Sequence, residues 1–105
     1  MRAGFGKVDM TPPLGTELAG YGYYLNRRAQ RVEDPLYVRA AAFWGQEEKP
    51  FLIVSCDCLG LSRAVVQEAE SALRAAHGIP ADHVMIVSIH THTGPAIKHH
   101  EGCGV

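Results

Sequence analysis

Two closely spaced histidines are the residues of this sequence best suited to metal chemistry. The chain of 105 residues holds six histidines, four of which lie between His90 and His100. His90 and His92 are two residues apart, so an extended backbone would point both side chains to one face, with Cα atoms ~6.6 Å apart. Both imidazoles can then reach one zinc ion, because Zn–N bonds are about 2.0–2.1 Å long; alternatively, one binds the metal and the other serves the substrate. Six histidines in this chain give by chance roughly a third of one such pair, so its place in the fold decides its value.

Two cysteines and a carboxylate form a second candidate group on another segment. Cys56 and Cys58 can complete a Cys₂His₂ structural zinc site with His90 and His92, although buried free cysteines are also common core residues. Asp57 can orient an imidazole by accepting its second N–H. It can also cap a helix or the following turn through backbone N–H groups, which is the reading that the residues alone favour.

The other four histidines have simpler interpretations. His77 is placed as a favourable charge at a helix C-terminus, and His83 precedes a strand and has no visible partner. His99 and His100 belong to a terminal tail, and such tails mostly face solvent.

The elements that would position the candidate residues are a β-hairpin and a βαβ unit. Leu36–Trp44 and Phe51–Asp57 are apolar runs joined by a turn-rich connection, which predicts the hairpin. The second run is apolar on both faces, so we expect a central strand that is covered on both sides. The stretch 3–10 alternates only loosely before a rigid turn, and residues 26–33, with three arginines, are typical of a surface loop.

The βαβ unit follows from the next forty residues. Ser62 can cap a helix over Arg63–His77, which Gly78 would close as a left-handed residue. Val84–Ile89 is another apolar run, so it predicts a strand parallel to the Phe51–Asp57 strand, joined by a right-handed crossover. The fold class is therefore α/β with a mixed sheet. Ligands bind beyond the carboxyl ends of parallel strands, where the cysteines and histidines would meet.

Composition excludes several classes of protein. Ten Lys and Arg balance eleven Asp and Glu, so no basic footprint for nucleic acid is present. No apolar run approaches the ~20 residues of a membrane span, and no apolar stretch of about 7–15 residues near the N-terminus indicates a signal peptide. Three cysteines are an odd number, which favours a reduced, cytoplasmic setting over a secreted one. The length fits one small domain.

Five segments of the sequence occur together in a known family. They are Gly4–Pro13 (GFGKVDMTPP), Leu18–Gly22 (LAGYG), Asp34–Ala40 (DPLYVRA), Val54–Gly60 (VSCDCLG) and His90–Pro95 (HTHTGP). In this order they resemble the N-terminal part of the catalytic domain of the neutral/alkaline (non-lysosomal) ceramidase family. Members of that family typically show Thr-His-Thr-His-Ser-Gly-Pro in the last segment, where this chain has Ile89 and Thr93 at the flanking positions.

The resemblance implies a zinc-dependent amidase that acts on a lipid-like amide. The family hydrolyses N-acylsphingosine (ceramide) to a sphingoid base and a fatty acid. By the match, His90 is a zinc ligand and His92 lies beside the metal as a catalytic residue that contacts substrate. Gly20, Tyr21 and Gly22 would line the substrate site.

The resemblance also implies that residues 1–105 are one incomplete segment of a larger α/β metallohydrolase domain. The family's other ligands, a second His, a Glu and a Tyr, come from segments beyond Val105, so the isolated chain is expected to bind zinc weakly and to turn nothing over. The alternative function is a non-catalytic metal-binding or interaction module that uses Cys56, Cys58, His90 and His92.

Overall fold

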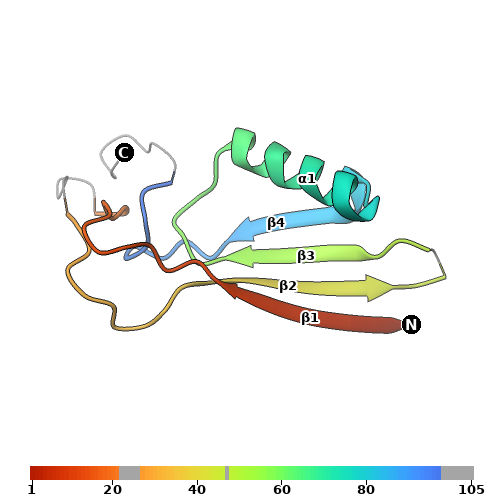
Figure 1. Ribbon diagram of the computed structural model, residues 1–105, viewed down its shortest axis with the longest axis horizontal. Helices are drawn as coiled ribbons and strands as arrows, with labels where there is room; N and C mark the ends of the chain where they lie inside the picture. Colours follow the sequence, from red (N-terminus) through yellow and green to blue (C-terminus); the bar gives the residue numbers. More distant parts are fainter. Residues whose placement is uncertain (22–26, 47, 98–105) are drawn as a thin grey trace.

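The computed structural model describes residues 1–21, 27–46 and 48–97 and has one mixed sheet with a helix on one face (Figure 1). The elements in chain order are β1 (Arg2–Asp9), β2 (Tyr37–Trp44), β3 (Phe51–Cys56), α1 (Arg63–His77), the short 3₁₀ helix η1 (Ala81–His83) and β4 (Val84–Ser88). The order of strands across the sheet is β1-β2-β3-β4.

The predicted hairpin and βαβ unit are both confirmed. Strands β2 and β3 pair antiparallel, and β3 and β4 pair parallel, with Cys56 opposite Ser88. The two parallel strands therefore end level with each other. Figure 1 shows that their carboxyl ends point towards the side of the molecule where the loop after β1 also lies.

Helix α1 begins and ends at the residues that the sequence predicts. The Ser62 hydroxyl accepts a hydrogen bond from the Val65 N–H (3.2 Å). At the other end Gly78 has a φ of 66° and donates its N–H to Arg74 O (2.9 Å). Lys49 donates to the last carbonyl of the helix, that of His77 (3.0 Å), so the helix is capped at both ends.

Strand β1 was not predicted, because glycines interrupt its pattern. Gly4 and Gly6 pair with Ala42 and Ala40 of β2, and they leave no side chains whose alternation would mark a strand. A Cβ at Gly4 would lie 3.5 Å from the Trp44 ring, an ordinary van der Waals contact, so packing against this ring does not itself require glycine.

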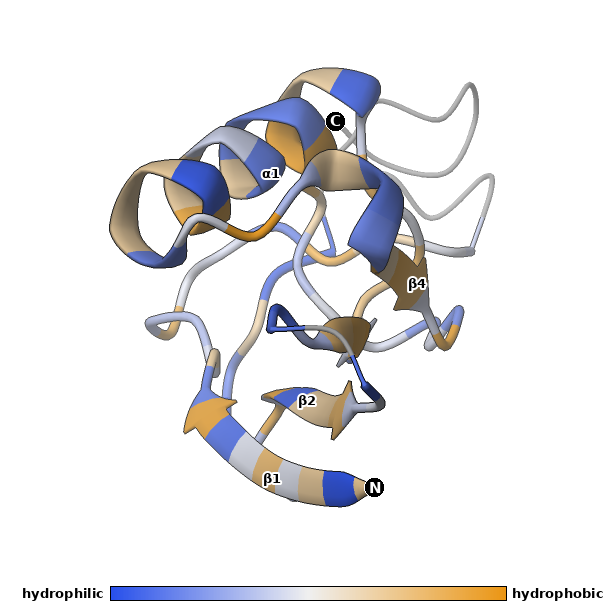
Figure 2. Cartoon of the chain, turned by 90° about the vertical axis from the view of Figure 1, so that its right-hand side faces the viewer, coloured by the Kyte–Doolittle hydropathy of each residue, from blue (hydrophilic) through white to orange (hydrophobic). Residues whose placement is uncertain are grey.

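The second face of β3 is open within the described residues, which corrects the expectation of cover on both sides. The helix α1 lies over one face of the sheet (Figures 1 and 2), and Leu52 and Val54 are half-buried, in alternation with the exposed residues of β3. On the opposite face Phe51 and Ile53 are 45% and 47% exposed, and Met85, which pairs with Ile53, is 60% exposed. Strand β3 is central as predicted, but only one layer packs on it.

Candidate active site

Residues that follow β3 and β4 stay paired beyond the ends of the strands. Ile89 donates its N–H to Cys56 O (3.1 Å), and His90 donates its N–H to Cys58 O (3.0 Å). The segment that carries both candidate histidines is thereby held against the chain after β3. This is the edge at which α/β sheets bind ligands.

The imidazole of His90 is oriented by a backbone carbonyl. Its Nδ1 lies 2.9 Å from Leu59 O, and because a carbonyl oxygen only accepts, Nδ1 carries the hydrogen. In the neutral ring the lone pair is then on Nε2. A histidine that ligates a metal has the same arrangement, in which one ring nitrogen donates to a fixed oxygen and the other binds the ion.

The backbone at His90 is not extended, which corrects one step of the prediction. Strand β4 ends at Ser88, and His90 has a φ of 71°. The rings of His90 and His92 are nevertheless adjacent, with centroids 4.9 Å apart and planes at 78°. A left-handed residue other than glycine costs roughly 1–3 kcal/mol and is often found at functional sites, so the surrounding contacts hold His90 in this conformation.

His92 packs against the loop that follows β1. The Tyr21 ring meets the His92 ring edge to face at 5.4 Å. Gly20 has a φ of +123°, and a Cβ there would lie 2.7 Å from His92 Cγ. The structure thus brings Gly20 and Tyr21 beside the predicted catalytic histidine, whereas Gly22 lies outside the described residues. Within the described residues, neither ring nitrogen of His92 has a hydrogen-bond partner.

Backbone hydrogen bonds join the two loops around this contact. Ala19 donates to Gly94 O (3.0 Å), and Ala96 donates to Glu17 O (2.9 Å). Gly94 is buried, and a Cβ there would lie 3.2 Å from Asp57 O. Gly20 and Gly94 therefore allow the loop after β1, the chain after β3 and the histidine segment to approach one another closely.

Sequence reasoning missed Arg27, which it assigned to a surface loop. The Arg27 guanidinium donates from Nη2 to His92 O (2.6 Å) and to Ala19 O (3.2 Å). It also lies over the Tyr21 ring, 4.6 Å from the centroid. No pattern in the sequence could find these contacts, because every residue offers a backbone carbonyl.

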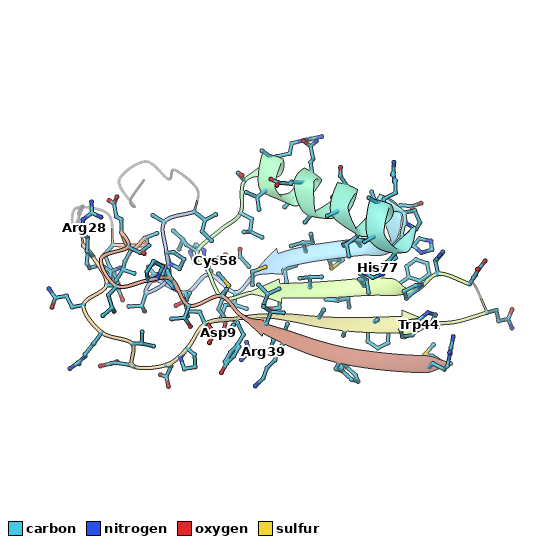
Figure 3. The ribbon with its side chains drawn as sticks, viewed as in Figure 1. Asp9, Arg28, Arg39, Trp44, Cys58 and His77 are labelled. Atoms are coloured by element: carbon cyan, nitrogen blue, oxygen red, sulfur yellow. The ribbon has the colours of Figure 1, made fainter. Side chains whose placement is uncertain are left out.

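A cavity of about 800 Å³ lies beside the histidine segment. Its lining mixes apolar and charged side chains, and it comprises Thr11, Pro12, Leu18, Arg27, Arg28, Ala29, Gln30, Arg31, Val32, Glu33, Asp34, Leu36, Thr91 and Thr93. Arg28 belongs to the loop region at this end of the molecule, while His77 lies at the other end (Figure 3). Thr91 and Thr93 flank His92 in the chain, so the cavity borders the candidate site.

Two solved structures with a similar arrangement of elements are ceramidases. The neutral ceramidase from Pseudomonas aeruginosa matches with a TM-score of 0.76 and 24% identity, over 89% of this chain and 15% of that chain. A ceramidase complexed with C2 matches with a TM-score of 0.75 and 25% identity, over 90% and 15%. The chain has a neutral ceramidase fold. The resemblance that the motifs predict is thereby confirmed.

The similarity to ceramidases is found in the fold and in short sequence motifs. No family model and no curated protein matches the sequence. The chain spans about 15% of the length of the ceramidase structures that it matches. Within the described residues, no helix is both long enough and apolar enough to cross a membrane.

Two of the three cysteines of this chain, Cys56 and Cys58, are packed in the interior. Cys56 and Cys58 are both buried, and Cys58 Sγ donates to Gly60 O (3.8 Å). Burial raises the pKa of both thiols, and for Cys56 the charge of Asp57 raises it further. Zinc binds the thiolate, which these pKa values disfavour. Residues 1–21, 27–46 and 48–97 contain no group of three or more His, Cys, Asp or Glu that could hold a metal ion, so Cys56, Cys58, His90 and His92 form no such cage here.

Asp57 connects β3 to β2, which corrects both roles considered for it. Its carboxylate accepts the Tyr37 N–H (2.9 Å) and two contacts from Arg39 Nη1 (3.1 and 3.2 Å). Leu59 O, and not Asp57, accepts from the His90 ring, and Ser62, and not Asp57, caps α1. Asp57 is 7% exposed, and a buried carboxylate needs such donors.

Replacement of Asp57 by alanine is expected to lower the free energy of unfolding by about 2–3 kcal/mol. The change removes a charged acceptor from the Tyr37 N–H, and hydrogen bonds to charged groups contribute roughly 1.5–3 kcal/mol. Arg39→Met is the matched control, because it keeps the Tyr37 N–H bond to Asp57 and removes the ion pair of a half-exposed arginine, worth up to about 1 kcal/mol, together with its contact over the Tyr37 ring at 4.9 Å. Urea unfolding measures both. Equal losses for the two variants would contradict the role assigned to the Tyr37 hydrogen bond.

The remaining described histidines lie away from the candidate site. His77 is in the last turn of α1, as predicted. His83 does have partners, contrary to expectation: Nδ1 lies 3.2 Å from Pro50 O, and the ring stacks on Phe51 at 3.9 Å. His99 and His100 lie outside the described residues.

Proposed function

We propose that this chain is part of a zinc-dependent amidase that hydrolyses a lipid-like amide, most simply N-acylsphingosine, to a sphingoid base and a fatty acid. The observation that carries the proposal is the His90 ring, whose Nδ1 is committed to Leu59 O at 2.9 Å. The ring is 4.9 Å from that of His92 and belongs to an exposed residue. The names of the two similar structures, a neutral ceramidase and a ceramidase, support the substrate class.

The donor set of the described residues fits part of a zinc site. His90 offers Nε2, and His92 has both ring nitrogens without partners among the described residues. A catalytic zinc needs three protein ligands and an open position, so the proposal assigns the other ligands to polypeptide outside these 105 residues. The open face of the sheet at Ile53 and Met85 supports further packing of this kind. When bound, zinc would polarise the amide carbonyl and lower the pKa of bound water to about 7.

The chain's own residues would orient the substrate and handle a proton. The His92 ring lies 4.9 Å from that of His90, and its nitrogens have no partner among the described residues, which suits His92 to accept or donate a proton there. Tyr21 and Gly20 pack on the ring and limit its motion. The cavity beside Thr91 and Thr93 gives room for part of a substrate.

The proposal is tested by measuring fatty-acid release from N-acylsphingosine by the full-length protein. We expect turnover that a chelator abolishes and added zinc restores. The 105-residue chain alone should bind zinc weakly and release no fatty acid. His77→Gln is the control, because it removes a histidine far from the site. Turnover that persists in chelator would refute the zinc dependence. Failure to hydrolyse both short-chain and long-chain N-acylsphingosines would refute the substrate class.

A further inference from the structure

We propose that Arg27 is a positioning residue for His92, fixing both its backbone and the aromatic ring that packs on it. The inference deepens the proposed function, but only its kinetic test rests on that function. Arg27 belongs to the loop between β1 and β2, outside both histidine-containing and glycine-containing motifs.

The first contact is a bridge between two backbone carbonyls. One nitrogen of the guanidinium, Nη2, lies 2.6 Å from His92 O and 3.2 Å from Ala19 O. Each terminal guanidinium nitrogen carries two hydrogens, so one nitrogen can serve both acceptors. A charged donor makes these hydrogen bonds shorter and stronger than neutral ones. By holding the His92 carbonyl oxygen, Arg27 fixes the plane of the peptide group that follows His92. This limits the directions in which the His92 side chain can leave the backbone.

The second contact acts through the Tyr21 ring. The Arg27 guanidinium lies 4.6 Å from the Tyr21 centroid, and Tyr21 meets His92 at 5.4 Å. His92 in turn meets His90 at 4.9 Å. One arginine thus contacts both the backbone of His92 and its packing partner. A planar cation can stack on the ring and donate sideways at once, whereas the ammonium of lysine cannot.

The neighbouring arginine provides a matched control. Arg28 donates to Gly15 O (2.9 Å) and is exposed. It has the same charge and nearly the same place in the chain, but the structure gives it no contact with His92 or Tyr21. If only the positive charge matters, Arg27→Met and Arg28→Met should change the position of His92 equally. If the contacts of Arg27 matter, only Arg27→Met should change it.

The decisive measurement is by NMR on the 105-residue chain. Wild type should show a cross-peak between the ring protons of Tyr21 and His92. We expect Arg27→Met to lose this cross-peak and to shift the His92 ring resonances, Arg27→Lys to weaken it, and Arg28→Met to retain it. Because lysine keeps the charge and can still donate a hydrogen bond, this variant guards against simple unfolding of the methionine variant. An unchanged cross-peak and unchanged His92 resonances in both Arg27 variants would overturn the proposal.

The kinetic measurement extends the test to the full-length protein. Misplacement of a catalytic group by about 1 Å can cost ~100-fold in rate, so Arg27→Lys should lower kcat by about 10- to 100-fold and change KM less. Arg74→Met, on helix α1 and outside the cavity lining, should leave both near wild type. Equal kinetic effects for the two positions would overturn the positioning role. Absence of amide hydrolysis in wild type would refute the proposed function and leave the NMR result to decide on Arg27.

Discussion

Replacement of His90 by asparagine is expected to lower the zinc affinity of the full-length protein by more than about 100-fold while leaving the chain folded. Loss of an outer hydrogen-bond partner of a ligand typically costs ~10- to 100-fold in affinity, and loss of the ligand itself should cost more. Asparagine tolerates the left-handed backbone of this position, where φ is 71°. The variant forfeits the hydrogen bond to Leu59 O, worth about 1 kcal/mol, and the ring contact with His92.

Two measurements check this result, namely zinc affinity by titration and the free energy of unfolding in urea. His77→Asn is the control, since it removes a histidine from the far end of α1 and should change zinc affinity little. Cys56→Ala and Cys58→Ala should also retain zinc, because both thiols are buried and disfavour the thiolate. A structural Cys₂His₂ site predicts the opposite, namely that each of the four substitutions unfolds the chain. Loss of zinc in the cysteine variants would therefore contradict the catalytic interpretation.

Replacement of Gly20 by alanine is expected to separate the loop after β1 from the histidine segment. The added Cβ would meet His92 Cγ at 2.7 Å and His92 Cα at 2.8 Å, distances at which something must move. The positive φ costs about 1–2 kcal/mol for alanine, and overpacking adds about 1–3 kcal/mol. We therefore expect a loss of about 2–5 kcal/mol in the free energy of unfolding. In the full-length protein, displacement of His92 should lower turnover by about 100-fold.

Gly15→Ala separates the two causes of this effect. Gly15 also has a positive φ, of +89°, but a Cβ there would meet nothing within 4 Å. This variant should show only the conformational cost of about 1–2 kcal/mol and keep normal turnover. Urea unfolding and fatty-acid release, measured on both variants, give the comparison. If Gly20→Ala were no worse than Gly15→Ala in either measurement, the close approach to His92 would have no functional consequence.

The order and type of most elements could be predicted because their signals are local. Ser62 and Gly78 mark the ends of α1 through their own side-chain and backbone properties. The apolar runs of β3 and β4 with one helix between them require a parallel pair. This pairing already brings the chain after β3 beside His90 and His92, so this juxtaposition of segments was predictable. Strand β1 escaped prediction because Gly4 and Gly6 leave no pattern of side chains.

The sequence by itself determined which residues reach the carboxyl edge of the parallel strands, since periodicity and the right-handed crossover decide that. Only the tertiary structure decided how they are held there. The left-handed backbone of His90, the contact of Gly20 with His92 and the Arg27 bridge all involve backbone atoms of distant segments. Every residue has such atoms, so these contacts cannot be predicted from the residue types in the sequence. The ion pair of Asp57 with Arg39 likewise depended on the register of β2 against β3, which places two charged side chains together.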